Sequence, residues 1–208
     1  MKAFLKHTGI VAPIMQDNVD TDQIIPSREM KRVSKLGLGD GLFANWRYQY
    51  DGKEKAGLVD EFVLNRPAHK STSIILTGKN WGCGSSREHA VWALYDYGIR
   101  VIVAESFGRI FYRNCARNGL LAIELSPDMI EMLAAQTSKD PQENRITIDL
   151  SKNRISAPNG TTFEFQIPKS DRNMLINGLD YIEYTLQHND EIGEFIKRDR
   201  HSRPWAYI

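Results

Sequence analysis

The chain has 208 residues, of which 41% are hydrophobic and 25% are charged, and its formal net charge is +1. These values are typical of one globular domain, with room for an appendage, and the near balance of 27 basic and 26 acidic residues argues against a nucleic-acid binder. Two cysteines give no disulfide framework, no apolar run could span a membrane, and the N-terminal apolar run is broken by Pro13, so we expect a cytoplasmic protein.

The first 60 residues predict one strand followed by mostly irregular chain. Residues 3–14 favour a strand with a turn at His7-Thr8-Gly9. The segment DNVDTDQIIP (17–26) is rich in acids and ends at a proline, which is typical of a loop. Residues 27–59 contain five glycines and predict irregular chain, with one short helix in GLFANWRY.

From residue 72 onward, apolar β-branched runs alternate with helical segments. We expect strands at 72–78, 100–106 and 120–125, and helices at 85–98, 107–119 and 126–136. Such alternation predicts right-handed βαβ crossovers and a parallel sheet, and therefore an α/β fold. Ligands of such sheets bind at the carboxyl ends of the strands, where strand-to-helix turns lie.

The C-terminal third changes pattern twice. Residues 146–167 alternate between apolar and polar side chains, and Asn159-Gly160 between two such runs predicts a hairpin. The remaining chain favours helices. Four apolar residues at helical spacing predict packing into the core: Leu175, Leu179, Ile182 and Leu186.

The segment NWGCGSSREHA (80–90) combines a glycine-rich turn with several reactive side chains. It follows a predicted strand and opens a predicted helix, where free N–H groups and the helix dipole favour an anion. Arg87 adds a planar fork that matches a carboxylate or phosphate in two places. Because the turn lacks the lysine of a Walker A loop and the third glycine of a dinucleotide fingerprint, we expect a small anionic substrate instead.

Side chains of this turn also fit structural roles. Ser85 and Glu88 form the pattern of a capping box, and the pattern does not choose between a cap and a catalyst. Cys83 could be a reactive thiol, since helix N-termini lower the pKa of thiols. His89 and Cys115 fit structural positions.

Four segments carry a resemblance to a known family. GCGSSREHA (82–90) resembles the signature of the aconitase superfamily, found in its small swivelling domain, and DNVDTDQIIP (17–26) resembles a segment of its free-standing small subunits. GLGDGLFANWRY (37–48) and AESFGRIFYRNCARNGLL (104–121) are similar to segments of the bacterial 3-isopropylmalate dehydratase small subunits.

This resemblance implies an architecture. We expect an aconitase-like swivelling β/β/α domain over residues 1–168, built on βαβ units with a parallel sheet core. Residues 27–57 would form a flexible specificity loop region within it. Residues 169–208 would form a C-terminal helical extension packed on the same domain.

The resemblance also implies a reaction. The family enzyme isomerises 2-isopropylmalate to 3-isopropylmalate through isopropylmaleate, by removing and re-adding water, in leucine biosynthesis. A 4Fe–4S cluster on a separate large subunit acts as a Lewis acid, so this chain would need that partner and hold no metal itself. A small dicarboxylate would be the substrate, with no nucleic acid or membrane as partner.

Roles for particular residues follow from the family pattern. Ser85 matches the catalytic base, Ser86 a residue that orients the substrate, and Arg87 a substrate-carboxylate arginine. Gly84 would let the substrate approach the backbone. Asp22 matches an active-site aspartate, and its alternative role is to cap the loop.

One segment departs from the family pattern. Some relatives carry Tyr-Leu-Arg shortly after Ile-Ile-Pro, in a loop that helps to choose the substrate, whereas this chain has SREMKR (27–32). Arg28, Lys31 or Arg32 could approach the substrate there. A homoaconitate, citraconate or methylmalate substrate therefore stays open, as do a non-catalytic anion-binding module and, against the charge balance, an RNA-binding relative.

Overall fold

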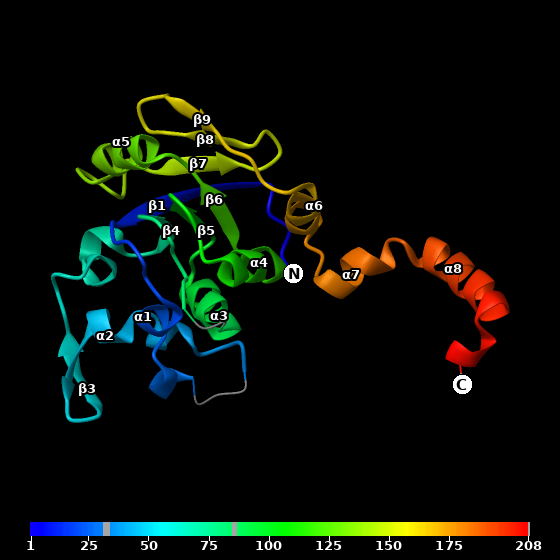
Figure 1. The fold of residues 1–208 in the computed structure, drawn as a ribbon. Helices are drawn as coiled ribbons and strands as arrows, with labels where there is room; N and C mark the ends of the chain where they lie inside the picture. Colours follow the sequence, from blue (N-terminus) through cyan, green and yellow to red (C-terminus); the bar gives the residue numbers. More distant parts are fainter. Residues whose placement is uncertain (31–33, 85–86, 208) are drawn as a thin grey trace.

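The computed structural model describes residues 1–30, 34–84 and 87–207. Over these residues a seven-stranded sheet has the strand order β6-β5-β4-β1-β7-β8-β9, and a separate two-stranded sheet pairs β2 with β3. Figure 1 shows α3 and α4 beside the β4–β6 part of the large sheet, and α5 near β7–β9. None of the helices in the described ranges is long and apolar enough to cross a membrane.

Four strands form the parallel part of the sheet. They are β1 (Lys6–Ile14), β4 (Thr72–Thr77), β5 (Val101–Ala104) and β6 (Leu121–Glu124). The crossover helices are α3 (Glu88–Tyr97) and α4 (Arg109–Arg117), and α5 (Pro127–Thr137) follows β6. The α/β class, the βαβ units and the parallel core are confirmed.

Glycines stand at the ends of the two crossover helices, α3 and α4. Gly98 is the C-cap of α3 with φ 116°, and Gly119 follows α4 with φ 80°. Both lie in the left-handed region that only glycine adopts without strain. α5 has Ser126 as its N-cap and Pro127 as its first residue, although the Ser126 side chain makes no capping hydrogen bond.

The rest of the large sheet is antiparallel. β7 (Ile146–Asp149) pairs with the start of β1, and β8 (Arg154–Ser156) and β9 (Thr162–Glu164) follow. The predicted hairpin is confirmed, with Gly160 at φ 87° in its turn. The turn expected at His7-Thr8-Gly9 is wrong, because these residues lie inside β1 and pair with β7.

Alternating side chains of the strands build a core on each face of the sheet. Ile75 and Ile102 contribute to the core that contains buried residues of α1 and α3. Their neighbours Ile74 and Val101 contribute to the core that contains buried residues of α5 and β7–β9. This period of two arises because successive side chains of a strand point to opposite faces.

Residues 27–59, expected to be irregular, contain regular elements. The short helix is confirmed as α2 (Ala44–Arg47), and a hairpin of β2 (Tyr48–Asp51) and β3 (Glu54–Leu58) was not predicted. Short 3-10 turns within this segment are η1 (Ser27–Glu29) and η2 (Gly39–Gly41), and η3 (Val63–Asn65) and η4 (Pro67–His69) follow it. The segment 17–26, expected to be a loop, contains the short helix α1 (Thr21–Ile24), which a capping box at Asp20 starts.

The C-terminal helices pack less than expected. Their bounds are α6 (Lys169–Asn177), α7 (Tyr181–Leu186), α8 (Asn189–Ser202) and η5 (Pro204–Ala206). Leu175 of α6 is buried, but Ile182 and Leu186 are 68% and 56% exposed, so the predicted core stripe is wrong beyond α6. The reason is local: Gly178 ends α6 in the left-handed region, and Asp180 starts a new helix with a capping box.

The last helices of the expected extension are largely exposed. Neither α7 nor α8 has a buried residue, and Figure 1 shows both running away from the sheet. Large apolar side chains on this arm, among them Phe195 and Trp205, are more than half exposed. Tyr184 of α7 still packs against the core, and the guanidinium of Arg117 lies 4.7 Å from the ring centre of Tyr181, so the contact with the domain extends from α6 into α7. Packing of all of residues 169–208 on the domain stays a prediction.

Candidate active site

Three strand-to-helix turns meet at the carboxyl ends of β1, β4 and β5. Isolated bridges join Asp20 to Cys83 and Trp81 to Phe107. Backbone hydrogen bonds reinforce this meeting point, since Gly82 donates to the carbonyl of Val19 at 2.7 Å. The glycine-rich turn therefore lies at the edge of the sheet where an α/β fold binds ligands.

Glycine is required at two close approaches within this meeting point. A Cβ on Gly82, which has φ 71°, would lie 2.2 Å from Cγ of Phe111 on α4. A Cβ on Gly108 would lie 2.5 Å from the carbonyl oxygen of Gly82. The first turn of α4 thus packs directly on the backbone of the glycine-rich turn.

We expect Gly82→Ala to destabilise the fold more than Gly160→Ala. Both glycines have positive φ, which should cost alanine about 1 kcal/mol, but nothing lies within 4 Å of a Cβ on Gly160. The clash with Phe111 should add about 1–3 kcal/mol. Urea unfolding of the isolated chain measures the difference, and equal midpoints for the two variants would contradict this packing.

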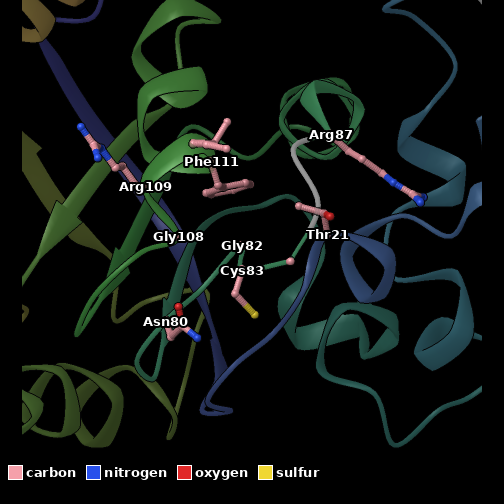
Figure 2. A pocket seen from close by; sticks show the side chains of 10 residues that line it. Thr21, Asn80, Gly82, Cys83, Arg87, Gly108, Arg109 and Phe111 are labelled. Atoms are coloured by element: carbon pink, nitrogen blue, oxygen red, sulfur yellow. The ribbon is translucent and has the colours of Figure 1, made fainter.

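A cavity of about 340 Å³ opens at the turn, as Figure 2 shows. Its lining residues are Thr21, Asn80, Gly82, Cys83, Gly84, Arg87, Gly108, Arg109, Ile110 and Phe111. Among the residues that the structure describes, no acidic side chain lines it. Its volume suits a small ligand, and its two arginines favour an anionic one.

Arg87 lies at the N-cap position of α3, with its side chain 27% exposed. Its Nη1 donates to Oδ1 of Asp22 at 2.5 Å and to Oγ of Ser27 at 2.7 Å. Asp22 belongs to α1, which Asp20 starts with a capping box. The structure therefore brings together Asp22 and Arg87, two candidates that are 65 positions apart in the sequence.

The other candidates fall in three groups. Gly84 lines the cavity with φ 85°. Arg28 is held elsewhere: its Nη2 donates to Oδ1 of Asn45 at 2.5 Å and its guanidinium lies 4.4 Å from the ring centre of Tyr50. It is not among the residues lining the Arg87 cavity. Four candidates lie outside the described residues: Ser85, Ser86, Lys31 and Arg32.

The capping box expected for Ser85 and Glu88 falls outside the described residues, because Ser85 does. α3 begins at Glu88, with Arg87 at its N-cap position. The Glu88 carboxylate accepts a hydrogen bond from Asn118 Nδ2 at 2.8 Å. The His89 ring packs 4.8 Å from the ring of Trp92, as expected for a structural histidine.

The two thiols do not fit an iron–sulfur cluster. Cys83 lines the cavity and its Sγ lies 3.4 Å from the carbonyl oxygen of Asn18. Cys115 is fully buried in the core, and this burial raises the pKa of its thiol well above the usual value. Such clusters take three or four cysteine thiolates, and in the described ranges no three His, Cys, Asp or Glu side chains gather to bind a metal ion.

The sequence does not single out two residues at the site. Ser27 carries no signal that distinguishes it from the basic residues after it, and the only signal in the segment of Arg109 is the family resemblance. In Figure 2 the side chains of Arg109 and Arg87 extend in opposite directions from the turn. Arg109 follows Gly108 at the start of α4, the position where the sequence places a second strand-to-helix turn.

Comparisons with known proteins find one family and relatives that match along the whole chain. The family model named aconitase C-terminal domain matches residues 1–128. A 3-isopropylmalate dehydratase small subunit from Cupriavidus necator is 46% identical, over 100% of this chain and 99% of its own length. One from Agrobacterium fabrum is 45% identical over 99% of this chain and 100% of its own.

A solved structure shares the fold. The 3-isopropylmalate dehydratase structure from Methanocaldococcus jannaschii superposes with a TM-score of 0.66 at 29% identity, covering 91% of this chain and 99% of its own. The sequence matches extend over the whole chain, including the α7–α8 arm. The chain therefore belongs to the aconitase C-terminal domain family, among the small subunits of 3-isopropylmalate dehydratases.

Proposed function

We propose that this chain is the small subunit of a heteromeric hydro-lyase that isomerises 2-isopropylmalate to 3-isopropylmalate through isopropylmaleate, in leucine biosynthesis. The observation that carries the proposal is a cavity with Arg87 on its wall, at the carboxyl ends of the strands, in a chain 46% identical to a named small subunit over its whole length. A dicarboxylate suits this cavity because the described lining has arginines and no acids.

The chemistry gives each proposed residue a task. Removing a proton next to a carboxylate builds negative charge on that carboxylate, and aimed N–H groups and an arginine stabilise such charge. We propose Arg87 as the residue that binds the substrate carboxylate, Ser85 as the base that takes the proton, and Ser86 as a hydrogen-bonding residue that orients the substrate. Gly84, with φ 85°, leaves the backbone open to the ligand.

Substrate choice is proposed to involve residues 27–57. Arg28 is bound to Asn45 and stacked on Tyr50, so its part would be to hold this segment in place. Lys31 and Arg32 are the remaining basic candidates for a contact with the substrate.

The 4Fe–4S cluster is proposed to be held by the large subunit, because the two thiols of this chain do not fit one. When bound there, the cluster supplies a Lewis acid for the hydroxyl group that leaves. We also propose a cytoplasmic location, with no nucleic-acid or membrane partner. Two free cysteines and a formal net charge of +1 support these points.

We expect removal of residues 180–208 to weaken association with the large subunit without unfolding the domain. Helices α7 and α8 bury no residue, while Ile182 is 68% and Trp205 69% exposed, so a second chain is needed to cover them. Analytical ultracentrifugation with the large subunit measures association, and urea unfolding of the isolated chain measures stability. Undiminished association would contradict a role for this arm in the heteromer.

A substrate comparison tests the proposed activity. The heteromer is assayed with 2-isopropylmalate, a methylmalate and the hydroxy acid that loses water to form homoaconitate, and formation of the unsaturated acid is followed by ultraviolet absorbance. The proposal expects the highest kcat/KM for 2-isopropylmalate. A higher value for either of the other acids would replace the substrate while keeping the reaction class.

A further inference from the structure

Arg87, Asp22 and Ser27 form a closed set of hydrogen bonds beside the cavity. Nη1 of Arg87 donates to both other residues, and Oγ of Ser27 donates to Oδ1 of Asp22 at 3.3 Å. Because an Nη atom carries two protons, these two acceptors use both donors of Nη1.

The rest of the guanidinium has no acceptor among the residues that the structure describes. Within the described parts of the chain, neither Nε nor Nη2 of Arg87 has a hydrogen-bond or ion-pair partner. Nε and Nη2 carry the parallel N–H bonds of one edge of the fork, which match the two oxygens of a carboxylate. The contacts to Asp22 and Ser27 therefore orient the group without occupying that edge.

Ser27 is itself held in place from the opposite side. It is the first residue of η1, and the next two residues anchor this turn to α2 and the β2–β3 hairpin. Arg28 binds Asn45, as described above, and Glu29 forms an ion pair with Lys55 at 3.3 Å. A fixed acceptor restricts the orientation of a long side chain, which has several rotatable bonds to immobilise.

We infer that Ser27 and Asp22 are positioning residues, which hold Nη1 of Arg87 so that its Nε–Nη2 edge faces the substrate carboxylate. The inference rests on the proposed function, in which Arg87 binds that carboxylate. In this inference Ser27 acts through Arg87 and does not contact the substrate. Asp22 likewise contacts Nη1 of Arg87 and not the substrate. Both residues are exposed in the isolated chain, so neither is needed for the core.

The test compares Ser27→Ala with Ser27→Thr in the heteromer. Loss of one hydrogen bond to a charged group should raise KM about fivefold, with kcat changed by less than about twofold, and threonine should restore KM because it keeps the hydroxyl. Ser138→Ala is the matched control, since Ser138 is exposed at the end of α5, outside the segment proposed for substrate choice, and its Oγ donates to the carbonyl of Ala134. An unchanged KM for Ser27→Ala, or equal impairment by alanine and threonine, would overturn the inference.

Arg87→Lys separates failure of this inference from failure of the proposed function. If Arg87→Lys lowers kcat/KM and Ser27→Ala has no effect, the positioning role alone is overturned. If Arg87→Lys has no effect either, the binding role of Arg87 fails and the inference fails with it. In the Arg87→Lys background, Ser27→Ala should change KM by less than about twofold, since residues that act through one another are not additive.

Discussion

Ser85→Ala is expected to remove most of the isomerase activity while the chain still folds and binds its partner. Loss of a general base costs about 100- to 10,000-fold in rate. A chain of this size should tolerate the loss of one helix cap, which costs about 1 kcal/mol. The measurements are kcat of the heteromer and the urea midpoint of the isolated chain.

A structural cap would give the opposite result for the same substitution. It would lower stability by about 1 kcal/mol and leave kcat within a few fold of the parent. Turnover of Ser85→Ala at near the parent rate would therefore remove Ser85 from the chemistry. Ser126→Ala is a matched control, because Ser126 is the N-cap of α5 and makes no side-chain capping bond.

Arg87→Lys is expected to lower kcat/KM about 10- to 100-fold, although the positive charge is kept. A lysine ammonium cannot present two parallel N–H bonds to a carboxylate, and hydrogen bonds to charged groups contribute about 1.5–3 kcal/mol each. It also cannot reproduce the paired contacts of Nη1 with Asp22 and Ser27. Steady-state kinetics of the heteromer measures the loss.

Arg109→Lys provides the comparison for this variant. Both arginines line the same cavity, but only Arg87 is oriented by hydrogen bonds to other side chains in the part of the chain that the structure describes. We expect Arg109→Lys to change kcat/KM less than Arg87→Lys. A larger loss for Arg109→Lys would identify Arg109 as the main carboxylate contact.

The parallel half of the fold could be predicted because its signals are local. Strands β4–β6 are runs of β-branched apolar residues, and glycines end α3 and α4 where the left-handed conformation is needed. The β2–β3 hairpin was missed because its strands bury no residue and so carry no apolar pattern, although Asp51-Gly52 marks its turn. The core stripe predicted through α7 was wrong, but the sequence does carry the signal against it. Gly178 ends one helix, and the Asp180–Glu183 capping box begins the next.

The candidate site was less predictable because its parts are distant in the chain. Arg87 could be singled out from the turn that carries it, and Asp22 entered only through a family resemblance. Their pairing with each other and with Ser27 joins residues 60 and 65 positions apart, which no local pattern specifies. The roles of Ser85, Ser86, Lys31 and Arg32 stay predictions, since these residues lie outside the described parts of the chain.

Dependence of activity on a second polypeptide tests the account most directly. The isolated chain, the isolated large subunit and their mixture are each subjected to anaerobic iron–sulfur reconstitution, analysed for iron and assayed with 2-isopropylmalate. We expect iron on the large subunit, no stable cluster on this chain, and isomerisation only in the mixture. A stable cluster on this chain alone, or isomerisation without the large subunit, would contradict the account.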